Sequence, residues 1–572
     1  MTAVARPDFT PRPSPLASEA LAASGGLILL ATALLVFLTL PLASLLVRSA
    51  QGGSGEFVAF ANFAEYFAAP AFARSAQNTL VFAGLTTGIT VPLAFVFAYA
   101  IQRSCIPAKG LWRSIAMIPI LAPSMLAALS FIYLFGNQGL LKFMLGWFGV
   151  QTIYGMPGMV LAMVFSSFPH AVMILLAALA LSDARLYEAA DSMATPGWRK
   201  FLTITLPGAR YGLISAAMVV FTMAVSEFGV PKVIGGNTSV LAIDVYKQVI
   251  GQQNFSMGAV VGLILLVPVL VAFFIDFLVR KRQKALLTAR SVPYSPRPAP
   301  LRDFVLLAFV LVMSACMLVV VGMAVFGSFV KVWPYNLSFT LNHYTYGFEE
   351  AGVDDAYPNS VKMALACALF GAAVTFAGAY WLEKTRGADV LRPLIRLQAM
   401  MPMAVPGMVL GIGYILFFNH PANPLGFLYG TMTILVLSTI IHFYSSSHLT
   451  AVTALKQLDN EFESVSASLK VPFYKTFWRV TVPVCLPSII DISRYYFVNA
   501  MTTISCVVFL YSPKTTLASI SILHLDEAGN VGSAAAMATL IVATSAVVTV
   551  LFFVAEWWLV RRTQRWRDTG RS

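Results

Sequence analysis

A polar segment with the sequence EAADSMATPGW, residues 188–198, separates two long apolar runs and continues to the tetrapeptide ITLP at 204–207. Each of the flanking runs is long enough to cross the hydrocarbon core of a bilayer as a helix. A related segment, ESVSASLK at 463–470, also lies between apolar runs and ends in VTVP at 480–483. The recurrence of this arrangement indicates a membrane protein built from two similar halves.

The composition agrees with a membrane location. Of the 572 residues, 58% are hydrophobic and 11% are charged, and the mean hydropathy is +0.78. Soluble domains carry about 25% charged residues. A transmembrane barrel would show short alternating segments of about ten residues instead of the long apolar runs that recur here. We therefore predict an all-α membrane protein.

Twelve transmembrane helices are predicted, as two parallel six-helix repeats. An even number of spans per half relates the halves by an axis along the membrane normal. With the N-terminus inside, most of the 38 Lys and Arg residues lie in cytoplasmic loops and tails, as the positive-inside rule requires. Both termini and both polar segments are then cytoplasmic. The spans are expected near 26–48, 78–101, 112–135, 156–181, 208–231, 256–279, 303–330, 359–382, 395–418, 425–447, 486–510 and 533–559.

The two halves match along their length. Asn78 at the start of the second span corresponds to Asn359, 281 positions later, and Pro207 corresponds to Pro483, 276 positions later. An offset that drifts so little over several spans indicates duplication. We expect a disordered cytoplasmic tail at 1–25, a first half at 26–281 with the loop 183–207, a cytoplasmic linker at 282–301, a second half at 302–560 with the loop 459–483, and a basic cytoplasmic tail at 561–572.

Several kinds of chemistry are excluded by the sequence. It contains no phosphate-binding Gly-x-x-x-x-Gly-Lys-Ser/Thr, no His-Glu-x-x-His and no Gly-x-Ser-x-Gly motif. The five cysteines form no Cys-x-x-Cys pair, so neither a metal site nor a disulfide framework is expected. The net charge of +13 is spread over loops, which argues against a nucleic-acid partner. A membrane enzyme is therefore a weak alternative to a transporter.

The first polar loop resembles the EAA loop of ABC-importer permeases, whose pattern is Glu-Ala-Ala, then a Gly, then Leu-Pro. Ala194 stands where the Gly belongs. Ser182 and Asp183 are placed to cap a short helix, and Glu188 falls in its first turns, where the helix dipole favours a carboxylate. The resemblance implies that this helix docks into a separate ATPase subunit through Glu188, Ala189, Ala190, Ala194, Leu206 and Pro207.

The second loop departs from this pattern. Counted back from Pro483, Ser464 stands at the Glu position and Glu463 comes one residue early. The resemblance still assigns Glu463, Ser464 and Pro483 to ATPase coupling, and it implies asymmetric coupling with the better-formed contact at the first loop. It further implies two ATPase subunits that bind the ATP, no cofactor in this chain, a periplasmic binding protein, and the inner membrane of a bacterium. The basic linker could contact anionic membrane lipid.

Polar side chains inside spans are candidates for a translocation path, because burying them in lipid is costly. Arg494 lies three residues after Asp491, so these two could simply pair with each other. The amide and hydroxyls of the same span could line the path or bond between helices. Prolines that break spans predict kinked helices beside the path, at Pro119, Pro123, Pro402 and Pro406. The candidate path residues are Glu227, Arg494, Asn499, Thr502 and Thr503.

The chain as a whole resembles the fused permeases of the iron, polyamine and phosphonate importer group, and within it the 2-aminoethylphosphonate permeases. The resemblance lies in the stretches FGVPKVIGG at 228–236, YKQVIGQQNFSMGA at 246–259 and VVFLYSPKTTLAS at 507–519. It implies import of 2-aminoethylphosphonate, with ferric iron or polyamine as alternatives. A secondary transporter driven by an ion gradient would also have twelve spans, but it would not need EAA loops.

Overall fold

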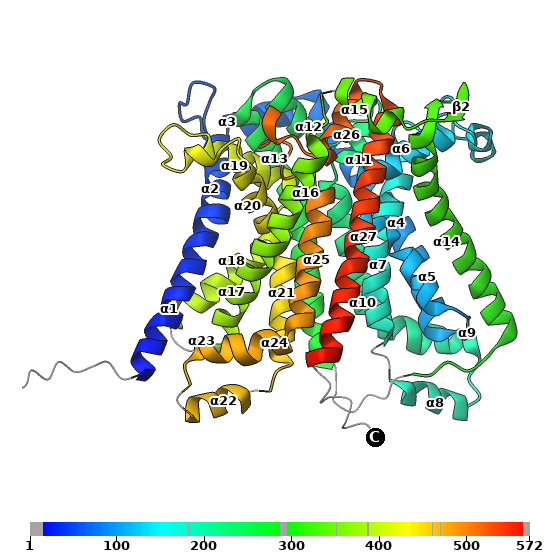
Figure 1. Ribbon diagram of the computed structural model, residues 1–572. Coiled ribbons are helices and arrows are strands. Elements are labelled where there is room, and N and C mark those ends of the chain that lie inside the picture. The colour runs from blue at the N-terminus through cyan, green and yellow to red at the C-terminus, as the bar shows by residue number, and fades with distance from the viewer. Residues whose placement is uncertain are drawn as a thin grey trace, which may run out of the picture.

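The computed structural model describes residues 15–180, 183–286, 294–350, 352–385, 388–459, 461–469 and 471–563. It is a bundle of long helices with short helices at both ends (Figure 1). The expected tails at 1–25 and 561–572 lie largely outside the described residues, as does the linker segment 287–293. Greek α marks α-helices, and η marks short 3₁₀ or π-helical segments.

The described residues of the first half form six helical crossings and several short connecting helices. The crossings are α1 (Pro15–Leu34), η1 (Leu35–Thr39) and α2 (Leu40–Ser49); α4 (Pro70–Arg103); α5 (Lys109–Ala116), η2 (Ile118–Leu121) and α6 (Ser124–Phe135); α7 (Met156–Ala180); α10 (Leu206–Ser226); and α13 (Phe255–Leu286). The connections hold α3 (Ala61–Ala68), η3 (Lys142–Phe148), α8 (Ala184–Ser192), α9 (Gly197–Lys200), η4 (Phe201–Thr205), α11 (Gly229–Ile234), α12 (Leu241–Tyr246) and η5 (Lys247–Gly251).

The second half repeats this order. Its crossings are α14 (Pro300–Phe329); α16 (Ala356–Ala366), η7 (Cys367–Gly371) and α17 (Ala372–Lys384); α18 (Leu391–Met400), η8 (Met401–Ala404) and α19 (Gly407–Phe418); α20 (Met432–His442) and α21 (Tyr444–Lys456); α24 (Val482–Val484) and α25 (Leu486–Thr502); and α27 (Val531–Thr563). The connections hold the antiparallel strands β1 (Val330–Val332) and β2 (Asn336–Phe339), then η6 (Asn342–Tyr344), α15 (Tyr346–Glu350), η9 (Gly426–Leu428), α22 (Glu461–Ser468), α23 (Phe473–Thr476), η10 (Phe477–Thr481), η11 (Pro513–Thr515) and α26 (Ala518–Glu527).

Proline breaks the third crossing of each half, as predicted. The helix pair that ends at Leu121 and restarts at Ser124 is bent by 99°, and the equivalent pair around Pro406 is bent by 114°. Proline removes a backbone donor and disfavours helix at the residue before it. Among the described residues, eight continuous helices are long and apolar enough to cross a membrane, and the two bent pairs raise this number to ten. The other two predicted spans, the tenth and eleventh, correspond to shorter helices, α20 with α21 and α25.

The fifth crossing of each half is shorter than its apolar run. The span expected to reach 231 ends as helix α10 at Ser226, and the span expected to reach 510 ends as helix α25 at Thr502. The next residues, Glu227 and Thr503, have extended backbone with ψ of 128° and 142°. Residues 503–510 are mostly buried turns. Hydropathy cannot separate a buried turn from a helix, so the sequence overestimated both spans.

Matched hydrogen bonds confirm the duplication. The backbone N–H of Leu241 donates to Thr79 Oγ1 (2.9 Å), and the N–H of Ala518 donates to Ser360 Oγ (2.8 Å). The neighbouring amides repeat the pattern, because Asn78 donates to the carbonyl of Ser239 before α12, and Asn359 donates to the carbonyls of Lys514 and Thr516 before α26. In each half these bonds fasten a short helix to the second crossing.

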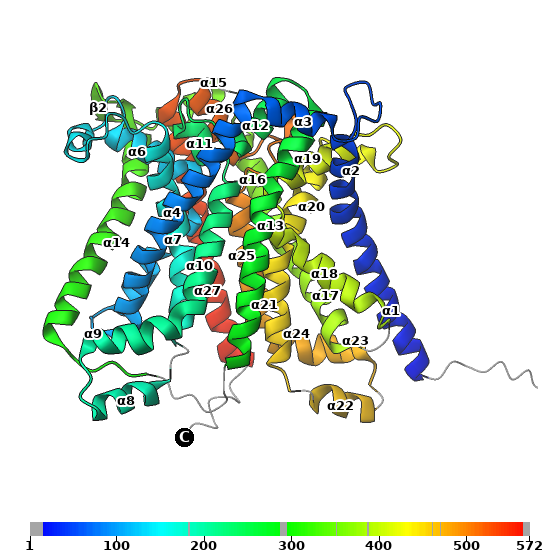
Figure 2. The same ribbon diagram turned by 180° about the vertical axis from the view of Figure 1, so that it is seen from behind.

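The first helix of each half packs on the other half. Helices α1 and α2 lie against α17, α18 and α19, whereas α14 lies against α4, α5 and α6 (Figures 1 and 2). Tyr414 on α19 donates a hydrogen bond to the carbonyl of Phe37 (2.7 Å), and Gln398 donates to Thr39 Oγ1 (3.1 Å). The two halves are therefore interlocked by an exchange of their first helices.

Candidate functional site

The first polar loop forms helix α8 at one end of the bundle. The Asp183 carboxylate accepts a hydrogen bond from the N–H of Arg185 (3.1 Å), as expected of a helix cap, while Ser182 lies outside the described residues. Glu188 and Ala189 are exposed and Ala190 is buried. The face of α8 that points away from the bundle thus presents a carboxylate next to a small side chain.

Helix α8 ends in a turn whose geometry explains the Gly of the EAA pattern. The backbone of Ala194 has φ of +51°, which L-residues rarely adopt. The N–H of Thr195 donates to the carbonyl of Ala190 (3.0 Å), and the N–H of Met193 donates to that of Ala189 (3.2 Å). These bonds satisfy carbonyls at the helix end in the way that usually requires a glycine.

We expect Ala194→Gly to stabilise α8. The left-handed conformation costs an L-residue about 1–2 kcal/mol, part of which is offset by the greater backbone entropy of glycine. A net gain of about 1 kcal/mol corresponds to roughly five-fold slower hydrogen exchange of the α8 amides. The control, Ala189→Gly, places glycine inside the helix and is expected to speed exchange. Faster exchange in Ala194→Gly would contradict the assigned turn.

The second loop has the same backbone pattern. The N–H of Leu469 donates to the carbonyl of Val465 (2.9 Å), and the N–H of Val471 donates to that of Ser466 (2.9 Å). Each of these residues stands 276 positions after its counterpart at the end of α8. Ser464 therefore occupies the position of Glu188, as the alignment from Pro483 predicts, while Lys470 lies outside the described residues.

The residue before the Glu position anchors each loop helix. In the first half the Arg103 guanidinium lies 5.2 Å from the centre of the Tyr187 ring and donates to the carbonyl of Leu179 (2.7 Å). In the second half Lys384 Nζ lies 3.1 Å from Glu463 Oε1. Arg103 and Lys384 end equivalent helices, 281 positions apart. Glu463 therefore pairs with Lys384 on the side of the bundle, while its assignment to the ATPase contact stays a prediction.

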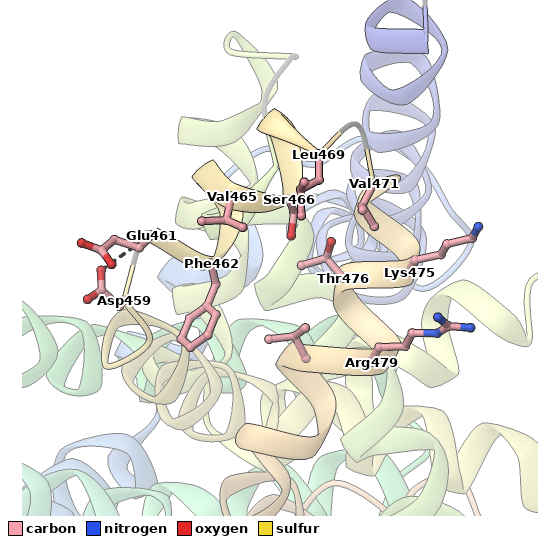
Figure 3. A pocket seen from close by; sticks show the side chains of 11 residues that line it. Asp459, Glu461, Phe462, Val465, Ser466, Leu469, Val471, Lys475, Thr476 and Arg479 are labelled. Carbon is pink, nitrogen blue, oxygen red and sulfur yellow. Dashed lines mark hydrogen bonds between the residues drawn. The ribbon is translucent and has the colours of Figure 1, made fainter. Parts of the chain in front are cut away.

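A gap lies behind the second loop helix. A cavity of about 690 Å³ separates α22 from α23 and η10, with Phe462 and Val465 on one side and Thr476 on the other (Figure 3). In the first half an ion pair between Lys200 and Asp191 joins α9 to α8. Lys200 stands 276 positions before Thr476, so the residue that forms this pair is not repeated. The contacts that hold the loop helix to the next short helix therefore differ between the two halves.

Apolar side chains are exposed at equivalent positions of the two loops. Leu186, Met193 and Trp198 have 58%, 73% and 68% of their surface accessible. Their counterparts in the second half are also exposed, as Phe462, Leu469 and Tyr474. Each loop continues into the next crossing, with Leu206 and Pro207 opening α10 and Pro483 in α24. A partner bound to either loop would be linked directly to a crossing helix.

The candidate path residues fall into two groups. The Glu227 carboxylate accepts hydrogen bonds from Ser124 Oγ (2.7 Å) and from the N–H of Val230 (3.1 Å), so it ties the end of α10 to the proline break before α6. Thr503 occupies the equivalent position 276 residues later, with its hydroxyl 3.5 Å from Cys506 Sγ. These two residues mark the point in each half where the fifth crossing ends.

The other path candidates are bonded within α25. Arg494 forms the ion pair with Asp491 that its spacing predicts (2.7 Å), and its guanidinium lies 4.6 Å from the Phe553 ring centre on α27. Asn499 Nδ2 and Thr502 Oγ1 donate to carbonyls one turn earlier in their own helix. Within the described part of the chain no hydrogen bond or ion pair links Arg494 with Glu227. The structure does not gather the five candidates into one site.

Sequence reasoning missed a polar group at the end opposite to the loops. Lys232 on α11 pairs with Glu527 on α26 (2.6 Å), which joins the two halves, and its Nζ lies 5.0 Å from the Tyr246 ring centre. Burial, with a smaller contribution from Glu527, raises the pKa of Asp526 to about 6. In the sequence, the signal that could have revealed this group is Lys232, a single charged residue within an apolar stretch. Among the described residues, no group of three or more His, Cys, Asp and Glu is placed to hold a metal ion.

Comparison with known families finds one family in both halves of the chain. The family described as binding-protein-dependent transport system inner membrane component matches residues 90–285 and again residues 375–565, which together include both loops. The chain belongs to this family. It is a fused, multi-pass permease subunit of an ABC importer, and hence a transporter.

The names of individual relatives of this permease state different substrates. It is 26% identical over 508 residues to a ferric transport system permease protein of Actinobacillus pleuropneumoniae. The matched region covers 86% of this chain and 72% of that one. It is 30% identical over 152 residues to the molybdenum transport system permease protein of Escherichia coli K12, which covers 26% of this chain and 66% of that one. These relatives do not support the resemblance to 2-aminoethylphosphonate permeases.

A solved structure also resembles part of this permease. A bacterial alginate ABC transporter, crystallised with an alginate-bound periplasmic protein, has a chain with 18% sequence identity and a TM-score of 0.40. The likeness covers 47% of this permease and 96% of that chain.

Proposed function

We propose that this permease imports ferric iron across the inner membrane of a bacterium. The observation that carries the proposal is the likeness to a ferric transport permease along 86% of the chain. In this reading a periplasmic binding protein delivers the cargo at the end formed by α11 and α26. Two ATPase subunits bind ATP on the cytoplasmic side, where both termini lie. The path residues are Glu227, Arg494, Asn499, Thr502 and Thr503.

The two loops are the proposed docking points for the ATPase subunits. Their matching apolar residues and the carboxylate of Glu188 lie exposed at one end of the bundle. In this assignment Ala189, Ala190, Ala194, Leu206 and Pro207 form the first contact. Ser464 and Pro483 belong to the second, with Glu463 holding α22 from behind. The first contact is the stronger one because it has the carboxylate.

The path residues include a carboxylate, which is compatible with a cation as the cargo. A phosphonate would need a cationic donor, and Arg494 is already paired with Asp491. The Glu227 carboxylate offers oxygen ligands, which suit a hard cation. Glu227 already accepts two hydrogen bonds, which fix its position at the end of α10. Asn499 and Thr502 on α25, and Thr503 directly after it, supply further polar atoms.

Uptake measurements test the substrate. In cells that lack this chain we expect loss of labelled ferric iron uptake, restored by the wild-type chain, with 2-aminoethylphosphonate and polyamine uptake unchanged. Loss of phosphonate uptake alone would replace iron by 2-aminoethylphosphonate and leave the importer assignment intact. Uptake that continues in cells without the ATPase would favour an ion-driven transporter.

A further inference from the structure

The C-terminal end of the linker between the halves packs against the helix of the first loop. Residues 294–303, which we call the strap, run from the end of the linker into α14 and lie against helix α8. The Tyr294 ring lies 4.4 Å from the Tyr187 ring, measured between centres. The Arg103 guanidinium lies 4.5 Å from the centre of the Tyr294 ring. Two rings and one guanidinium therefore form a single packed group.

Polar contacts continue along the strap. Arg297 Nη1 lies 3.3 Å from Asp191 Oδ2 on α8. A second ion pair, from Lys200 to the same carboxylate, holds the pKa of Asp191 below its ordinary value. The Cys105 thiol donates to the carbonyl of Pro296 (3.4 Å). The strap thus contacts both α8 and the turn that follows α4.

The strap is also fixed to α14. The Asp303 carboxylate accepts hydrogen bonds from the N–H of Ala299 (3.0 Å) and from the N–H of Cys105 (3.3 Å). Arg302 donates to the carbonyl of Arg297 (2.7 Å) and pairs with Asp303. A displacement of α8 would therefore be passed to the first helix of the second half as well as to α10.

The second loop does not repeat the residues that bind the strap. Glu463 stands at the position of Tyr187 and pairs with Lys384. Ala467 stands at the position of Asp191. The contacts of the strap are therefore specific to the first loop, the same loop that keeps the Glu of the EAA pattern.

We propose that the strap is a positioning element of the first coupling helix, through which the fused linker takes part in coupling. Tyr294 and Arg297 act on the cargo only through α8, so they are positioning residues. The proposal rests on the proposed function, because it assumes that α8 receives the push of an ATPase subunit. It adds that the push reaches α14, and with it α4, α5 and α6, through the strap.

The test uses the complete importer, with its ATPase and binding protein, in proteoliposomes. We expect Tyr294→Ala combined with Arg297→Ala to lower cargo imported per ATP hydrolysed at least three-fold while ATP hydrolysis continues. Tyr294→Phe and Arg297→Lys keep the ring and the charge and are expected to retain the wild-type ratio. An unchanged ratio in the double variant, beside loss of uptake in Glu188→Ala, would overturn the strap alone. Unchanged uptake in Glu188→Ala as well would overturn the proposed function.

A crosslink tests the geometry without relying on activity. In a chain with a protease site inserted within 287–293, Pro296→Cys is expected to form a disulfide with Cys105 on mild oxidation. After cleavage the two halves would then migrate together on a denaturing gel until they are reduced. Cys105→Ser in the same background is the control and is expected to separate. Separation in the presence of both cysteines would contradict the position of the strap.

Discussion

Glu188→Ala is expected to lower cargo uptake at least ten-fold without lowering the amount of chain in the membrane. The Glu188 side chain is exposed on α8, and within the described residues its carboxylate makes no hydrogen bond or ion pair. Its removal should therefore leave the fold intact. A hydrogen bond to a charged group contributes about 1.5–3 kcal/mol, and the lower value corresponds to a factor of about ten. Uptake of labelled cargo and immunoblotting of membranes measure the two quantities.

A matched carboxylate on the second loop serves as the control. Glu461 is exposed in the first turn of α22, but it stands at the position of Arg185 rather than of Glu188. Glu461→Ala is expected to retain most of the uptake. Equal losses in both variants would mean that negative charge at this end of the bundle matters in general, and that Glu188 has no special contact.

Lys384→Met is expected to release the second loop helix from the bundle. The side chain of Lys384 is 7% exposed and that of Glu463 is 25% exposed, so removing the cation leaves a half-buried carboxylate without this partner. Loss of one member of a buried pair costs 3–5 kcal/mol, and we expect about 2 kcal/mol here because Glu463 is partly in solvent. Hydrogen exchange of the α22 amides should become about 30-fold faster, and uptake should fall.

Lys456→Met provides the comparison. Lys456 is 67% exposed and lies 4.0 Å from Glu383, so its loss should change neither exchange nor uptake measurably. Unchanged exchange of α22 in Lys384→Met would show that the ion pair does not hold this helix. Glu463 would then be free to serve the outward contact that its sequence position first indicated.

The loops and the proline breaks could be predicted because their signals are local. Asp183, the Glu-Ala-Ala triplet and Pro123 each act within a few residues of themselves. The break at Phe443, between α20 and α21, has no proline and left no such signal. The early end of α25 was hidden because the residues after Thr502 are as apolar as a span.

The contacts that define the site could not be predicted, because they join distant parts of the chain. From the sequence, Glu463 is predicted to be a carboxylate in a loop. The structure pairs it with Lys384, which lies 79 positions earlier in the chain. The strap depends on Cys105 and Pro296, which are 191 positions apart. The substrate assignment rested on short matching stretches, and the physical chemistry of the path residues alone does not choose between substrates.

The exchange of first helices has a consequence for how the protein is made. Helix α1 leaves the ribosome before the surface that receives it, because α17 to α19 are synthesised roughly 340 residues later. At about 5–20 residues per second this leaves α1 facing lipid for tens of seconds. Its crossing has a hydropathy of 2.4, high enough to wait in the bilayer alone. Because both receiving surfaces are on one polypeptide, every newly synthesised chain carries the two halves in a fixed one-to-one ratio.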